Sequence, residues 1–211
     1  MKINYDVLMQ KEMEKFNHKK KLLLHSCCGP CSSAVILRLK DYFDITILYY
    51  NPNIEPEEEY IKRKNEQKRL IHELNLGIHF KDSDYEHEAF LEASKHLEKE
   101  PEGGARCHKC YYLRLQKTGE LAKKEGFDYF GTTLTVSPYK NSEVINSIGL
   151  LIEKDLNKAY YEENKSVLVT RFLVSDFKKR EGYKKSIELS KTYHLYRQDY
   201  CGCLFAKDVD S

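Results

Sequence analysis

Cysteine is the residue that most constrains this chain, because all seven of its cysteines fall into three close groups. The groups are Cys27, Cys28 and Cys31, then Cys107 and Cys110 in a C-x-x-C, then Cys201 and Cys203 in a C-x-C. Scattered cysteines are often small buried apolar residues, whereas grouped cysteines in a reducing compartment are typical of metal binding or redox chemistry. The sequence therefore predicts a fold that closes around one thiol-rich site.

The remaining composition favours a reducing, cytoplasmic location for these thiols. No apolar run among the 211 residues is long enough to cross a bilayer, and the charged amino-terminal segment lacks the apolar core of a secretory signal. Structural disulfides are rare in the cytoplasm. The net charge is +2, with 35 basic and 33 acidic residues, so any nucleic-acid surface has to be local.

Short apolar stretches alternate with segments of helical periodicity along the whole chain. Strands are predicted at 22–24, 45–50, 77–80, 129–134 and 171–174, and helices at 5–16, 34–39, 57–74, 85–97, 107–126, 142–156 and 182–192. This alternation indicates right-handed βαβ units and a mostly parallel sheet covered on both faces. We expect a three-layer α/β/α fold and a single domain, 1–211, with an N-terminal helix in 1–18 packed on it.

Ligand sites in open parallel sheets lie beyond the carboxyl ends of the strands. The first cysteine group lies in the loop that directly follows the first predicted strand. Cys107 and Cys110 lie where a predicted helix begins, and the positive end of the helix dipole stabilises thiolates there. The sequence therefore predicts a metal site at the carboxyl ends of the strands.

The number of thiols bears on the kind of metal. Structural zinc takes four cysteine or histidine ligands and leaves three cysteines unused, while C-x-x-C spacing alone does not separate zinc from an iron–sulfur cluster. We favour iron, because four thiolates can hold a cubane cluster while the other three hold a second, incompletely coordinated metal. A zinc-stabilised RNA-binding module is the non-enzymatic alternative.

Six stretches give the chain a resemblance to a known family over nearly its whole length. They are HSCCGPCS (25–32), YYNPNIEPEEEY (49–60), GGARCHKCYYLRL (103–115), GFDYFGTTLTVSPYKN (126–141), DFKKREGYKKSIELS (176–190) and YRQDYCGC (196–203). Together they resemble the QueH type of epoxyqueuosine reductase. The resemblance implies an adenine-nucleotide-hydrolase-like (HUP-like) α/β fold, a [4Fe-4S] cluster with a nearby iron, and conversion of epoxyqueuosine to queuosine at the wobble position of tRNA. Some relatives carry Asp where this chain has Cys31.

The division of the thiols between two metals rests on the expectation that the adjacent side chains of Cys27 and Cys28 point in different directions. Four thiols are then expected on the cluster: Cys27, Cys107, Cys110 and Cys201, with Cys28 as the alternative fourth ligand. Three are expected on the second iron: Cys28, Cys31 and Cys203. A rival assignment makes Cys201 and Cys203 a redox-active disulfide beside a cluster held by Cys27, Cys28, Cys107 and Cys110.

The implied reaction needs two electrons, two protons and an electrophile on the departing epoxide oxygen. A cubane supplies electrons singly, and an adjacent iron with an open position can polarise that oxygen. Besides Cys201 and Cys203, the candidate catalytic residues are Asp199 and Tyr111, which lie next to ligands in the sequence and could relay protons. The electrons are expected from an external donor that the sequence does not identify.

Two other enzyme classes are alternatives. A tRNA-thiolating ATP pyrophosphatase would share the fold and could carry a cluster, but it needs an S-G-G-x-D-S type loop after the first strand. That position reads HSCCGPCSS here, so ATP is not expected as a partner. A thiol–disulfide oxidoreductase needs one C-x-x-C and gives no role to the five further cysteines.

The expected partner is tRNA, bound through the anticodon loop that carries epoxyqueuosine. Two basic sets are candidate contacts: Lys62, Arg63, Lys64, Lys68 and Arg69, and Lys178, Lys179, Arg180, Lys184 and Lys185. Four tyrosines beside the motifs are candidates for stacking on splayed bases: Tyr111, Tyr112, Tyr139 and Tyr200. Such lysine-rich helices are also common as solvated faces, and neighbouring glutamates weaken their field.

Overall fold

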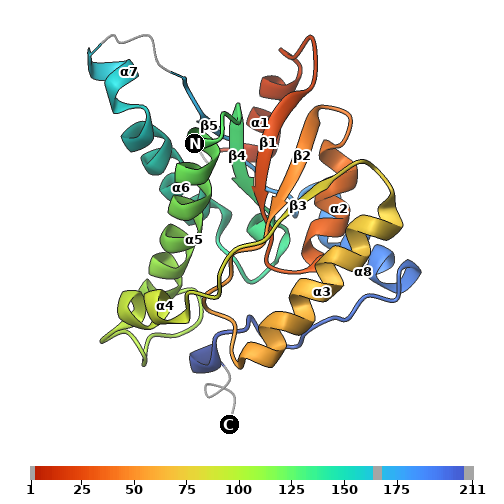
Figure 1. Cartoon of the computed structure of the whole chain (residues 1–211), viewed down its shortest axis with the longest axis vertical. Helices are drawn as coiled ribbons and strands as arrows, with labels where there is room; N and C mark the ends of the chain where they lie inside the picture. The colour runs from red at the N-terminus through yellow and green to blue at the C-terminus, as the bar shows by residue number, and fades with distance from the viewer. Residues whose placement is uncertain (1–2, 164–167, 207–211) are drawn as a thin grey trace.

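A computed structural model describes residues 3–163 and 168–206 of the chain, so both ends of the predicted 1–211 range lie outside the described residues. Within them, five parallel strands form one sheet in the order β3-β2-β1-β4-β5 (Figure 1). The strands are β1 (Lys20–His25), β2 (Phe43–Leu48), β3 (His79–Lys81), β4 (Tyr129–Thr132) and β5 (Arg171–Phe172). The central strand β1 pairs Leu24 with Ile47 of β2 and with Gly131 of β4.

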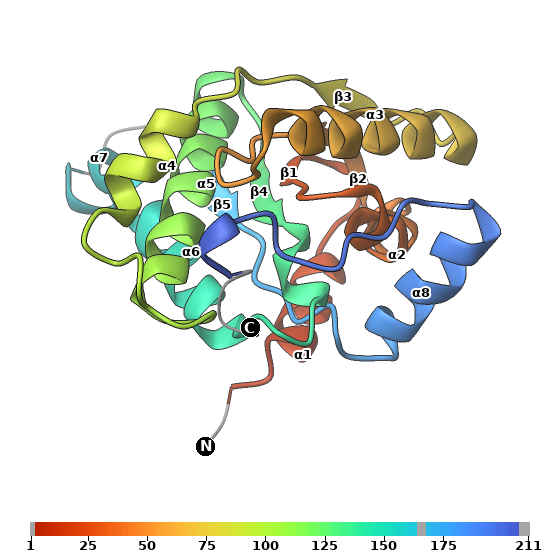
Figure 2. The same ribbon diagram turned by 90° about the horizontal axis from the view of Figure 1, so that it is seen from below.

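Helices cover both faces of this sheet. They are α1 (Tyr5–Met13), α2 (Gly29–Leu39), α3 (Glu57–Leu74), α4 (His87–Ser94), α5 (Ala105–Lys124), α6 (Ser142–Leu156), α7 (Lys158–Glu163) and α8 (Gly182–Thr192), with 3-10 turns η1 (Thr133–Val136) and η2 (Leu204–Ala206). Figures 1 and 2 show α2, α3 and α8 on one side of the sheet and α4, α5 and α6 on the other. None of the helices in the described ranges is long and apolar enough to span a membrane.

The alternation of side chains along β1 explains the two apolar layers. Leu22 and Leu24 are buried in one cluster with apolar residues of α1, α2 and α3, and α1 joins it through Met9 and Met13. Leu23, which points to the opposite face, is buried in a second cluster with residues of α5 and α6. The predicted three-layer α/β/α class is confirmed.

Several predicted boundaries differ from those of the structure, and three of the differences lie at β4, β5 and α2. The strand expected at 129–134 ends at Thr132, because the Thr132 hydroxyl accepts a hydrogen bond from the Leu134 amide at 3.1 Å and the chain continues as η1. The strand expected at 171–174 forms only two ladder residues, and the short helix α7 had not been predicted. The helix expected from residue 34 begins at Gly29 with Pro30 in its first turn, so Cys31 is helical and not in a loop.

Candidate metal centre

The first cysteine group lies at the carboxyl end of the central strand. There the fully buried His25 ring contacts the Thr132 hydroxyl at 2.9 Å and the Tyr50 carbonyl at 3.1 Å, which fixes the end of β1 against its neighbours. The chain then turns directly into α2, and the extended Cys28 caps that helix.

The sulfurs of this first group lie close together. Cys27 Sγ and Cys28 Sγ are 3.8 Å apart, and the three sulfurs of Cys27, Cys28 and Cys31 all lie within 4.8 Å of one another. The expectation that Cys27 and Cys28 diverge is therefore wrong: the tight turn between strand and helix brings both sulfurs to the same side.

Such spacing is that of ligands to a single ion. Thiolates bound at about 2.3 Å around one tetrahedral metal lie about 3.8 Å from one another. Thiolates on different irons of a cubane are farther apart, because an iron–iron edge separates them. The Gln198 amide also donates a hydrogen bond to Cys28 Sγ at 3.0 Å. Burial raises the pKa of Cys28 to about 12, whereas hydrogen bonds from Cys28 and Cys31 hold the pKa of Cys27 well below its usual value.

The second group lies at the beginning of α5, as predicted. Gly104 caps the helix, and the i, i+3 spacing places Cys107 and Cys110 on one face. The Gly103 amide donates a hydrogen bond to Cys107 Sγ at 3.2 Å. Arg106, which is 1% exposed, donates to the carbonyls of the preceding loop and so holds the helix start in place.

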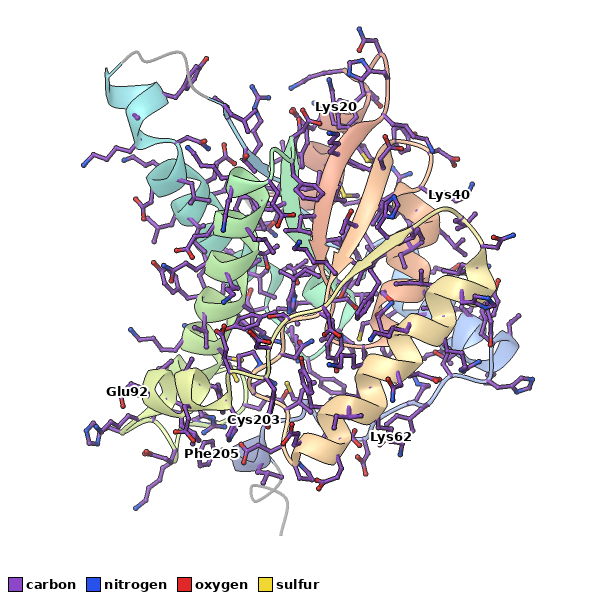
Figure 3. The ribbon with its side chains drawn as sticks, viewed as in Figure 1. Lys20, Lys40, Lys62, Glu92, Cys203 and Phe205 are labelled. Carbon is purple, nitrogen blue, oxygen red and sulfur yellow. The ribbon has the colours of Figure 1, made fainter. Side chains whose placement is uncertain are left out.

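The third group is carried across the carboxyl edge of the sheet by the segment that follows α8, as Figure 2 shows. The buried Arg63 guanidinium of α3 donates to the Cys201 carbonyl at 3.2 Å and to the Tyr200 carbonyl at 3.4 Å. The Glu55 amide donates to the Gly202 carbonyl at 2.9 Å. Figure 3 places Cys203 and Phe205 beside α4 and the start of α5.

Gly202 should be needed to hold the C-x-C segment in this conformation. Its φ is +107°, and an added Cβ would lie 2.8 Å from Ile54 Cγ1 and 3.1 Å from Arg63 Nη1. We expect Gly202→Ala to lower the free energy of unfolding of the metal-free protein by about 1–3 kcal/mol in urea titrations. Gly77→Ala is the control, because φ is +67° there but nothing lies within 4 Å of the added Cβ. Equal losses in the two variants would contradict the close approach at Gly202.

The second and third groups converge on each other. Cys110 and Cys203 are both buried and share a small apolar cluster with Phe90. Burial, together with the charges of Cys107 and Cys201, raises the pKa of Cys110 to about 12 and that of Cys203 to about 11. Among the described residues, the first group is the only set of three cysteines whose sulfurs all lie within 4.8 Å of one another. The four cysteines of these two groups lie close enough for their charges to act on one another.

Two buried cations face the cysteines. Arg114, one turn after Cys110, is 1% exposed, and its Nη2 has no hydrogen-bond partner among the described residues. Lys140 Nζ lies 3.4 Å from Cys201 Sγ and 3.9 Å from a Glu102 carboxylate oxygen. Burial lowers the pKa of Lys140, but the charges of Cys201, Tyr111 and Cys27 together raise it above its usual value.

The positive charges of Arg114 and Lys140 indicate whether a metal–thiolate centre would fit the site. Neutral thiols leave the buried Arg114 without a compensating charge and leave Lys140 with only the partly exposed Glu102 carboxylate, which is costly in a buried position. Thiolates bound to a metal carry net negative charge and compensate both cations. The donor set and the charges around it therefore fit an anionic metal–thiolate centre.

A cavity of about 340 Å³ opens beside the cysteines. Its lining includes Cys31 of the first group, Cys201 of the third, Lys140, Tyr139 and the candidate proton donor Asp199. The other candidate donor, Tyr111, is not part of that lining: it is 3% exposed, and burial raises its pKa.

Several important side chains had not been assigned to the site from the sequence. Lys140, Arg114 and Gln198 all lie within the recognised stretches, but no role had been given to them. The sequence signal that could have assigned them to the site was their position within those stretches. Arg63 was one of the candidate RNA contacts, but it is 1% exposed and bound to Glu59 at 2.6 Å and to the C-x-C segment, so it is not available to RNA.

The remaining candidate RNA contacts differ in whether their side chains are paired, buried or exposed. Most of the remaining basic candidates are paired with carboxylates: Lys64 and Lys68 with Asp82, Arg69 with Glu66 and Glu73, Lys178 with Asp176, Arg180 with Asp6, Lys184 with Glu181 and Lys185 with Glu188. Among the tyrosines, Tyr111 is buried and unavailable for stacking, whereas Tyr139 is 75% exposed.

The fold and site define an α/β protein that gathers cysteines at the carboxyl edge of a parallel sheet, where they could hold a metal. Among solved structures, the U34-tRNA thiolase NcsA from Methanococcus maripaludis with its [4Fe-4S] cluster is similar, with a TM-score of 0.55 and 14% identity over 96% of this chain and 71% of that chain. At this identity the likeness shows a shared fold.

The family follows from the sequence comparisons. The model of the family "Epoxyqueuosine reductase QueH" matches residues 22–209. A protein of that description from Streptococcus pyogenes is 40% identical over 97% of this chain and 78% of the relative, and one from Staphylococcus epidermidis is 38% identical over 97% and 85%. The chain belongs to the epoxyqueuosine reductase QueH family. The prediction of an epoxyqueuosine reductase, an enzyme of the final step of queuosine biosynthesis, is confirmed.

Proposed function

We propose that the chain reduces epoxyqueuosine in tRNA at a two-part iron centre, a [4Fe-4S] cluster and a separate iron. The observation that carries this proposal is a tight group of three sulfurs, with the other four cysteines gathered near two buried cations. The reaction consumes two electrons and two protons and converts the epoxide into an alkene and water. When bound, the iron centre supplies the electrons singly and polarises the departing oxygen.

The sulfur spacing supports a different ligand division from the one expected from sequence. We assign the separate iron to the tight group, Cys27, Cys28 and Cys31. We assign the cluster to the four remaining cysteines, Cys107, Cys110, Cys201 and Cys203. Relative to the earlier expectation, Cys27 and Cys203 exchange metals. A disulfide between Cys201 and Cys203 is disfavoured, because it would remove two of the four cluster ligands.

The cavity supports a position for the modified nucleoside. A volume of about 340 Å³ is within the range of small-ligand pockets, and the cavity borders Cys31 and Cys201, one cysteine from each proposed ligand set. Asp199 lies at its wall and is the candidate proton donor to the departing oxygen. Tyr139, at the same cavity, offers an exposed aromatic face for a splayed base of the anticodon loop.

Tyr139→Ala should weaken the recognition of tRNA without changing the chemical step. Base–aromatic stacking contributes about 1–3 kcal/mol, so we expect KM for epoxyqueuosine-containing tRNA to rise roughly tenfold while kcat is retained. Tyr139→Phe keeps the ring and should keep the KM. Steady-state kinetics with both variants checks this, and an unchanged KM in Tyr139→Ala would remove Tyr139 from the binding surface.

The proposed function is tested with protein loaded with iron and sulfide under anaerobic conditions. Chemically reduced protein is incubated with tRNA that carries epoxyqueuosine, and the digested nucleosides are separated and identified by mass. We expect queuosine to form, with about five irons and four sulfides bound per chain. Zinc without sulfide, or loaded protein that leaves epoxyqueuosine unchanged, would contradict the proposal.

A further inference from the structure

Lys140 is held between two fixed elements. It lies between η1 and α6, and the next residue, Asn141, caps α6 by accepting hydrogen bonds from the Glu143 and Val144 amides. The Lys178 ammonium donates to the Lys140 carbonyl at 3.2 Å. The backbone of Lys140 is thus fixed on both sides, and the direction of its side chain follows from the fold.

The Lys140 side chain points inward, where an ammonium group is costly. It is only 9% exposed, and lysine is rarely buried to this degree unless it is paired. Its polar contacts within the described residues are Cys201 Sγ at 3.4 Å and the Glu102 carboxylate at 3.9 Å. Glu102 is itself 42% exposed, so solvent screens its charge and the sulfur is the better-shielded partner.

We propose that Lys140 sets the reduction potential of the cluster bound through Cys201, by holding a desolvated positive charge against one ligand sulfur. This inference rests on the proposed cluster ligation. Reduction adds negative charge to the cluster, and a nearby cation in a poorly solvated site stabilises the reduced form more than the oxidised form. Hydrogen bonds to ligand sulfurs and net local charge are known determinants of cluster potentials. Lys140 is a positioning residue in this role, because it acts through the sulfur.

Variants that remove different charges near the cluster are expected to shift its reduction potential in opposite directions. Lys140→Met removes the charge at similar length and should shift the potential to a more negative value. Lys140→Arg keeps the charge and should leave the potential close to that of the native protein. Glu102→Gln removes the partly compensating carboxylate and should shift the potential to a more positive value. Lys109→Met is the matched control, because Lys109 lies beside Cys110 in sequence but is exposed to solvent.

The test is a redox titration of the loaded, full-length proteins, followed by electron paramagnetic resonance of the reduced cluster. We expect the order Lys140→Met, then native and Lys109→Met together, then Glu102→Gln, from most negative to most positive potential. Unchanged potentials in both Lys140→Met and Glu102→Gln would overturn the proposal. Should Lys140→Met fail to take up the cluster, the sign of the shift in Glu102→Gln decides, because that side chain is partly exposed and its change leaves the interior intact.

The titration separates this inference from the proposed function. The potential is measured without substrate, whereas conversion of epoxyqueuosine by chemically reduced native protein tests the function. Native protein that converts epoxyqueuosine, with variants that all share its potential, refutes only the role of Lys140. Native protein that binds no sulfide refutes both.

Discussion

Cys203→Ala should lose its acid-labile sulfide, whereas Cys27→Ala should keep it and lose about one iron per chain. The difference follows from the proposed ligand division, in which the three close thiolates hold a single iron and the other four hold the cubane. Turnover of epoxyqueuosine should be abolished in both variants. Cys203 lies in the buried group with Cys110, and Cys27 lies 3.8 Å from Cys28.

Iron and sulfide assays on anaerobically loaded protein check this pair directly. Each variant is the control for the other, because each removes one thiol from the two-part centre but from a different proposed metal. Sulfide that persists in Cys203→Ala and disappears in Cys27→Ala would restore the division of ligands expected from the sequence.

Arg63→Ala should destabilise the metal-free protein by about 3–5 kcal/mol, because it breaks a buried ion pair and leaves its partners unsatisfied. Arg63 is 1% exposed, binds Glu59 at 2.6 Å and donates to the carbonyls of Tyr200 and Cys201. Its loss frees the segment that carries two proposed cluster ligands, so we also expect cluster loading to fall sharply.

Urea unfolding and sulfide content after reconstitution measure the two effects. Lys64→Ala, one residue further along α3, is the control: its ion pair with Asp82 at 3.1 Å is partly exposed and should contribute less than about 1 kcal/mol. A stability of Arg63→Ala equal to that of Lys64→Ala would show that Arg63 does not anchor the C-x-C segment.

The long helices of this fold were predictable because their signals are local. The predicted ranges 57–74, 142–156 and 182–192 coincide with α3, α6 and α8. Each shows sustained periodicity, and α6 also has an asparagine cap. The ends of β4 and β5 were missed: β4 stops where the Thr132 hydroxyl accepts a hydrogen bond from the Leu134 amide, and β5 has only the two residues that pair with Tyr129 and Phe130.

One site for the three cysteine groups was predicted from their grouping and from the alternation of strands and helices, but their mutual geometry was not. The 3.8 Å spacing of Cys27 and Cys28 depends on a turn between β1 and α2 that alternation of side chains does not describe. Lys140 and Arg63 resemble surface residues in the sequence. Their burial depends on partners 61 and 138 residues away along the chain, namely the sulfur and the carbonyl of Cys201.

Anomalous scattering at the iron edge, from crystals of anaerobically loaded protein, tests the two-part centre most directly. The predicted result is one compact four-iron feature bounded by Cys107, Cys110, Cys201 and Cys203, with a separate single iron at Cys27, Cys28 and Cys31. A cluster bound by Cys27, or zinc in place of both iron sites, would contradict it.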